Sequence, residues 1–116
     1  MRVFIVEDEP LILFALEDML ADLGCEIVAS AMRVPEALGK AEALAFDIAI
    51  LDVNIAGDRV DPVADLLAAR GVPFVFATGY GPSAAPDRHR ERRVIAKPYR
   101  TRDLHEALAA SLPGRS

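Results

Sequence analysis

Short runs of apolar residues alternate along the chain with longer segments in which apolar residues recur every three or four positions. The short runs consist mainly of Val, Ile, Phe and Ala, which is typical of strands in a parallel sheet that is covered on both faces. The longer segments have the spacing of helices with one apolar face. We therefore expect strands at residues 3–6, 27–29, 48–51, 74–77 and 94–96.

The expected helices begin and end at recognisable signals. Pro10 lies near the start of the first helix, and Gly24 follows its last apolar residue. Asp61 and Pro62 have the pattern of a cap and a first-turn proline for the third helix, which stops at Gly71. The spacing predicts helices at residues 10–23, 35–44, 61–70 and 101–112.

Residues 78–93 interrupt this alternation, because they contain two glycines and two prolines and show no apolar stripe. We expect a short or irregular helix there, or a mobile loop with few buried contacts, in place of a regular fourth helix. Elsewhere, repeated strand–helix–strand units with right-handed crossovers predict an α/β fold with a doubly wound parallel sheet. Residues 1–116 are expected to form one domain.

Polar side chains follow four of the expected strands. Glu7 and Asp8 follow the first strand and Asp52 the third, while Thr78 ends the fourth and Lys97 follows the fifth. In an open α/β sheet the functional crevice lies beyond the carboxyl ends of the strands. The flavodoxin-like strand order 2-1-3-4-5 brings the first and third strands together. That order predicts three carboxylates, a hydroxyl and an ammonium at one edge of the sheet.

Three carboxylates at one place repel one another unless a cation offsets them. Mg²⁺ takes one or two carboxylates and keeps several waters, so Asp8 and Asp52 can bind it directly and Glu7 through a water. A carboxylate beside Mg²⁺ is a competent nucleophile towards phosphorus. Lys97 and the Thr78 hydroxyl can then hold the oxygens of a transferred phosphoryl group.

Together these residues resemble the receiver domain of bacterial two-component response regulators, over essentially the whole chain. The resemblance implies a protein that accepts a phosphoryl group on Asp52 from a sensor histidine kinase or a histidine phosphotransfer protein. It also implies a change in a surface that binds a downstream protein target. The residues that carry the resemblance are Glu7, Asp8, Asp52, Thr78, Lys97 and Pro98.

The resemblance assigns a role to the other residues at this edge of the sheet. Mg²⁺ would be held by Asp8, by Asp52 and by the backbone carbonyl of Asn54. Lys97 would contact the phosphoryl group, and Thr78 would swing towards it.

A narrower resemblance lies in residues 73–81, PFVFATGYG, which are similar to the PFxFATG-type motif of a subgroup of mostly alphaproteobacterial receivers. Some of those receivers stand alone without an output domain, and we expect none here. Receivers usually carry an aromatic residue two positions before the lysine, where this chain has Ile95. We therefore expect the switch in the segment after Thr78, with Tyr80 shielding the acyl phosphate. The peptide bond before Pro98 is commonly cis in the family.

Two other classes of function stay open. A small Mg²⁺-dependent phosphohydrolase would also use Asp52 as its nucleophile, but such enzymes need an acid two residues later, where this chain has Asn54. A receiver-like binding module would keep the fold without being phosphorylated. Taken alone, Asp8 and Glu9 are also consistent with ordinary caps of the following helix.

The composition of the chain excludes some classes of partner. The 116 residues are 53% hydrophobic and carry a net charge of −5, which argues against nucleic-acid binding. No apolar stretch approaches the roughly 20 residues that span a bilayer. The single cysteine, Cys25, excludes an internal disulfide and fits a reducing cytoplasm. We expect His89, His105 and the arginine-rich residues 88–93 to be solvated, the last as a face that can dock an acidic partner.

Overall fold

Five parallel strands form the main sheet of the computed structural model, which describes residues 1–111 apart from the side chain of Pro82. The strands are β1 (Arg2–Val6), β2 (Glu26–Ala31), β3 (Ile48–Asp52), β6 (Phe74–Thr78) and β7 (Val94–Ala96). Their order is β2-β1-β3-β6-β7, which confirms the expected flavodoxin-like order because β6 and β7 are the fourth and fifth strands of this sheet.

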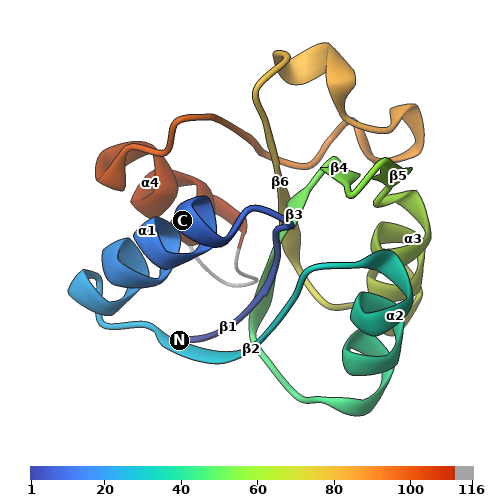
Figure 1. Ribbon diagram of the computed structural model, residues 1–116, viewed down its shortest axis with the longest axis horizontal. Coiled ribbons are helices and arrows are strands. Elements are labelled where there is room, and N and C mark those ends of the chain that lie inside the picture. The colour runs from blue at the N-terminus through green and yellow to red at the C-terminus, as the bar shows by residue number, and fades with distance from the viewer. Residues whose placement is uncertain (112–116) are drawn as a thin grey trace.

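Four α-helices within residues 1–111 cover the sheet. They are α1 (Pro10–Asp22), α2 (Val34–Ala43), α3 (Asp61–Arg70) and α4 (Thr101–Ser111). Figure 1 shows α1 and α4 on one face of the sheet and α2 and α3 on the other. Asp61 is the first residue of α3 and Val60 occupies the cap position, so the expected cap at Asp61 is wrong by one residue. Leu112, expected at the end of α4, lies outside the described residues.

The sheet separates two apolar cores because alternate side chains of a strand point to opposite faces. Val3 and Ile5 of β1 pack in the core that includes Leu16 of α1. Phe4 and Val6 pack in the core under α2 and α3. All five residues of β3 are buried, as expected for a strand covered on both sides. No helix among the described residues is long and apolar enough to cross a membrane.

The segment between β6 and β7 contains only two 3₁₀ turns, η1 (Pro82–Ala84) and η2 (Asp87–His89), which confirms the expected irregularity (Figure 1). It is anchored more firmly than its composition suggests. The imidazole of His89 is buried, with its centroid 5.4 Å from that of Phe74 and its Nε2 2.7 Å from Asp65 Oδ1. The expectation of a solvated His89 is therefore wrong, because β6 presents aromatic rings to this segment.

A small antiparallel hairpin follows β3 and is formed by β4 (Asn54–Ile55) and β5 (Asp58–Arg59). Its two-residue turn has positive φ at Ala56 (51°) and at Gly57 (88°). A turn with positive φ at both central residues matches the right-handed twist of paired strands. The hairpin was not predicted, since strands of two residues leave no hydrophobic periodicity.

Candidate functional site

Three acids meet at the carboxyl edge of the sheet because of the register between β1 and β3. Val6 pairs with Leu51, so the residues that follow them, Glu7 and Asp52, emerge side by side. Oxygens of these two carboxylates and of Asp8 all lie within 4.8 Å of one another. The structure thus brings together the three acids that the sequence predicts.

Lys97 lies between two of these acids. Its Nζ is 2.6 Å from Asp52 Oδ2 and 2.8 Å from Glu7 Oε1. The pairing of Thr78 with Ala96 across β6 and β7 brings Lys97 to the same edge. Burial alone would lower the pKa of Lys97, but its contacts with Asp52 and Glu7 outweigh this effect and raise the pKa. Lys97 therefore supplies positive charge that partly offsets the acids.

Glu7 is fully buried, which is rare for a carboxylate. Burial raises the pKa of Glu7 to about 7, although the Lys97 contact acts in the opposite direction. Its Oε2 accepts a hydrogen bond from the Glu9 N–H at 3.2 Å, and its Oε1 lies 2.8 Å from Lys97 Nζ. Three carboxylates with a single ammonium among them form a set of hard oxygen donors that fits a Mg²⁺ ion and its waters.

The β4–β5 hairpin is tied to the other two acids. Asp8 Oδ2 accepts a hydrogen bond from the Ala56 N–H at 2.8 Å, and Asp52 Oδ1 accepts one from the Asn54 N–H at 3.3 Å. Asp8 is half-buried, whereas Asp52 is buried. The loop after Asp52 is thus held against the acid cluster by backbone donors.

A cavity of about 400 Å³ opens over the acids. Thr78 is buried at the end of β6, and its Oγ1 accepts a hydrogen bond from the Tyr80 N–H at 3.0 Å. The Tyr80 side chain is 81% exposed. The peptide bond between Lys97 and Pro98 is cis, as the resemblance implies. The cavity is lined in part by Asp8, Asp52, Asn54, Tyr80 and Lys97.

Tyr99 is a residue near the site that the sequence did not point to. It is buried against the core that contains α1 and α4. Burial raises the pKa of Tyr99 far above its usual value, and the charges of Glu7 and Asp52 add to the effect. The signal that could have found it is an aromatic residue two positions after Lys97, in a chain that has Ile95 two positions before it.

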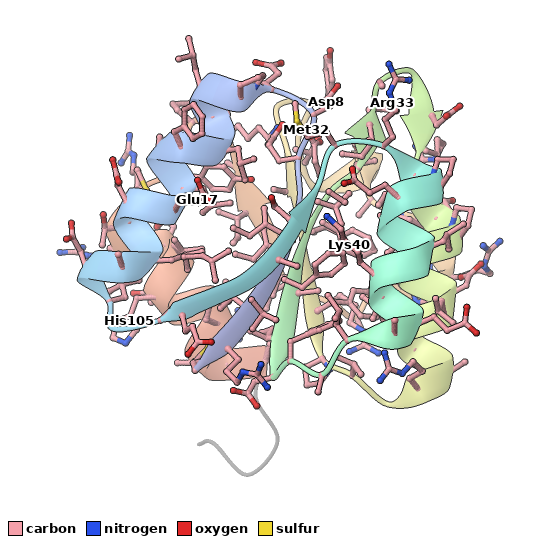
Figure 2. The ribbon with its side chains drawn as sticks, turned by 60° about the horizontal axis from the view of Figure 1, so that its bottom comes forward. Asp8, Glu17, Met32, Arg33, Lys40 and His105 are labelled. Carbon is pink, nitrogen blue, oxygen red and sulfur yellow. The ribbon has the colours of Figure 1, made fainter. Side chains whose placement is uncertain are left out.

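Two other residues of chemical interest lie apart from this edge. Figure 2 shows His105 at the opposite end of the molecule from Asp8, and its side chain is exposed, as expected. Cys25 is a half-buried free thiol.

The chain belongs to the response regulator receiver domain family, whose model matches residues 3–109. Receiver domains act in two-component signalling and typically bind Mg²⁺ at an acidic pocket, and the cluster of Glu7, Asp8 and Asp52 has the composition of such a pocket. The family membership and the fold predicted from the sequence are confirmed.

Similar solved structures cover almost the whole chain. The solution structure of SdrG from Sphingomonas melonis Fr1 is 45% identical, with a TM-score of 0.85 over 95% of this chain and 94% of that chain. The BeF3-activated conformation of SdrG from Pseudomonas melonis Fr1 is also 45% identical, with a TM-score of 0.80 over 94% of this chain and 93% of that chain.

Curated relatives are longer proteins. The transcriptional regulatory protein PdtaR of Mycobacterium tuberculosis is 34% identical over 111 residues, which make up 92% of this chain and 54% of that protein. The phyllosphere-induced regulator PhyR of Methylorubrum extorquens is 30% identical over 115 residues, 96% of this chain and 43% of that protein. The chain thus spans about half the length of these relatives.

Proposed function

We propose that this receiver accepts a phosphoryl group on Asp52 from a phosphohistidine and changes a protein-binding surface in response. The observation that carries the proposal is the arrangement around Asp52 at the sheet edge. Its carboxylate lies 2.6 Å from the Lys97 ammonium, beside the carboxylates of Glu7 and Asp8, and it lines a cavity of about 400 Å³. A nucleophile, a positive charge and space for an incoming phosphoryl group therefore coincide.

The transfer forms a bond between a carboxylate oxygen of Asp52 and phosphorus and breaks the P–N bond to the donor histidine, whose imidazole keeps the bonding electron pair. Lys97 already contacts Asp52, so its ammonium can move to the phosphoryl oxygens and stabilise their charge. The Thr78 oxygen accepts the Tyr80 N–H, which leaves the hydroxyl proton available for a phosphoryl oxygen.

Asp8, Asp52 and the backbone carbonyl of Asn54 would hold a Mg²⁺ ion, with Glu7 acting through a water. The cluster of three acids, with Lys97 as the ammonium that contacts two of them, supports this set. When bound, the ion would neutralise negative charge on the phosphoryl group.

The proposed switch is the segment between Thr78 and β7. Movement of the Thr78 hydroxyl towards a phosphoryl group would pull on the Tyr80 N–H that it accepts and so reorganise residues 81–93. Tyr80 lines the cavity and can shield the acyl phosphate from water. Ile95 is buried and has no ring to rotate, and Pro98 fixes the backbone beside Lys97. The PFVFATGYG motif supports the assignment to the PFxFATG subgroup.

We also propose the extent of the domain, its phosphoryl donor and its target. Residues 1–116 would act as one receiver domain whose phosphoryl donor is a sensor histidine kinase or a histidine phosphotransfer protein in the cytoplasm. Its target would be another protein rather than nucleic acid, consistent with a net charge of −5. The chain would promote only its own phosphorylation and dephosphorylation.

The test is phosphorylation with phosphoramidate, whose P–N bond resembles that of phosphohistidine, followed by intact-protein mass measurement. Wild type should gain one phosphoryl group in the presence of Mg²⁺, and Asp52→Asn should gain none. Asp22→Asn, at an exposed acid at the end of α1, is the matched control and should react like wild type. Labelling that survives in Asp52→Asn would overturn the assignment.

Phosphorylation assays also distinguish a receiver from the two alternative functions, a phosphohydrolase and a binding module that is not phosphorylated. A phosphohydrolase would release phosphate continuously from phosphomonoesters, yet Asn54 offers no acid two residues after Asp52. A binding module would not be labelled at all.

For the switch, beryllofluoride should change amide exchange in residues 79–93 more than in the sheet. An unchanged segment would place the switch elsewhere.

A further inference from the structure

The arginine-rich segment has a charge opposite to that of the rest of the chain. Residues 88–93 contain four arginines and one glutamate and so carry +3, which leaves −8 for the rest of a chain whose net charge is −5. Two of these arginines make contacts that hold the segment in place. Arg88 Nη2 lies 2.6 Å from Asp65 Oδ2, and the Arg92 guanidinium lies 4.1 Å over the Phe74 ring.

The other two arginines face a groove. A hollow of about 400 Å³ is lined by Arg90, Arg92 and Arg93, together with Val94 of β7 and small side chains near η1. Within residues 1–111, neither Arg90 nor Arg93 forms an ion pair with an acid. The carboxylate that contributes to the lining is that of Asp87. Arg92 lies 3.5 Å from Glu91 Oε1, so the positive charge that no ion pair among the described residues neutralises is that of Arg90 and Arg93.

We propose that this arginine groove, defined by Arg90, Arg92, Arg93 and Val94, binds an acidic segment of a protein partner. Guanidinium groups match carboxylates in geometry as well as in charge, and Val94 offers an apolar surface to a neighbouring side chain of the same segment. The proposal does not depend on phosphoryl transfer at Asp52.

Charge and size favour an acidic peptide over a nucleic acid. The groove of about 400 Å³ accommodates a few side chains. A nucleic acid would extend beyond it over a molecule whose other residues sum to −8, and that charge would repel its phosphates. A short peptide can place its carboxylates in the groove without covering the rest of the molecule.

The groove exists before any partner binds, because contacts with α3 and β6 hold residues 88–93 in place. His89 and Arg88 both contact Asp65 of α3, and Arg92 stacks on Phe74 of β6. A preformed site avoids part of the cost of ordering side chains and backbone on binding.

The test measures fluorescence anisotropy of a labelled peptide of alternating glutamate and alanine, titrated with the full chain at low salt. Reversing two charges with Arg90→Glu and Arg93→Glu should weaken binding by at least about tenfold. The matched control is Arg100→Glu with Arg102→Glu, the same charge change at two exposed positions at the start of α4, which should weaken binding much less. Asp87→Asn should strengthen binding, since it removes the carboxylate from the groove.

Several outcomes would overturn the proposal. Equal binding of the same peptide with glutamine in place of glutamate would show that charge is not recognised. Equal weakening by both arginine pairs would show attraction to the whole molecule rather than to the groove. Tighter binding of duplex DNA of matched charge would replace the protein partner by nucleic acid. If sedimentation shows a concentration-dependent dimer that is lost in the variant with Arg90→Glu and Arg93→Glu, the occupant of the groove is a second copy of this chain and not another protein.

Discussion

In the contact between Glu7 and Lys97, the cost of burying the carboxylate opposes its attraction to the ammonium. The Glu7 carboxylate is fully buried, and the Lys97 ammonium lies 2.8 Å from it while also contacting Asp52. One lysine serves two acids, so it does not cancel the cost of burying both. The ionisation of Glu7 therefore responds to pH near neutrality.

The first prediction follows from the raised pKa of Glu7. In protein prepared without divalent cations, the free energy of unfolding should fall as pH rises from 4.5, the ordinary value, to about 7, the folded value. A raised folded-state pKa means that this stabilisation is fully present below the unfolded pKa and is lost as pH rises through the folded one. The loss is at most about 3 kcal/mol.

Urea unfolding of wild type, Glu7→Gln and Glu42→Gln across this pH range checks the prediction. Glu7→Gln should have a flatter pH profile, while Glu42→Gln, at an exposed position of α2, should follow wild type. A Glu7→Gln profile as steep as that of wild type would contradict it.

The second prediction concerns Mg²⁺, which should stabilise the folded state by mass action. At a free concentration ten times the Kd, the gain should be about 1.4 kcal/mol. Asp8→Asn removes one carboxylate from the cluster and should lose most of that gain, whereas Asp22→Asn should keep it. Thermal melts with and without Mg²⁺ make the comparison. The site assignment fails if Asp8→Asn responds to Mg²⁺ as wild type does.

At the scale of elements, one carboxylate on α3 holds the segment that carries η1 and η2. Asp65 accepts from Arg88 at 2.6 Å and contacts His89 at 2.7 Å. The hydrogen bond with His89, together with the Arg88 contacts, holds the pKa of Asp65 below its usual value. A third tether runs from Arg59 of β5, whose Nη2 donates to the Ala84 carbonyl at 3.2 Å.

We therefore predict that Asp65→Asn loosens this segment locally without unfolding the sheet. Amide hydrogen exchange in residues 82–93 should accelerate by about tenfold. Global stability should fall by about 1 kcal/mol or less, because Asp65 is partly exposed. Asp18→Asn, at an exposed acid on α1, is the control and should leave exchange unchanged. Uniform acceleration over the whole chain would contradict a local role.

The elements differ in how far the sequence could predict them. The five strands of the sheet and the four helices followed from hydrophobic periodicity, since each buries a face whose spacing is visible in the chain. The burial of His89 could not be predicted, because it depends on Phe74 and Phe76, which a separate strand brings to it. The β4–β5 hairpin could not be predicted either, because its strands are too short to show a pattern.

At the scale of the whole molecule, topology assembles the candidate site. Asp52 and Lys97 are 45 positions apart in sequence and 2.6 Å apart in space. That encounter could be predicted, because parallel strands send their carboxyl ends to one edge. The distances could not be predicted, and neither could the complete burial of Glu7, because both depend on side-chain packing.

The fourth prediction compares two leucines of α1. Leu16 is fully buried in the core shared with α4, whereas Leu11 is 82% exposed. Leu16→Ala should lower the free energy of unfolding by about 2–5 kcal/mol, since it leaves a cavity. Leu11→Ala should change it by less than about 0.5 kcal/mol. Chemical denaturation gives both values, and similar losses would contradict the placement of α1.

The bond from the Ala56 N–H to Asp8 Oδ2 has a practical consequence for experiment. Anything that draws the Asp8 oxygen away, a cation above all, weakens the only side-chain contact that this amide is seen to make among residues 1–111. The resonance of the Ala56 amide is therefore a native reporter of the occupancy of the acid cluster. It can be followed in a nitrogen-15 spectrum of the unaltered protein, with no dye attached and no acid replaced.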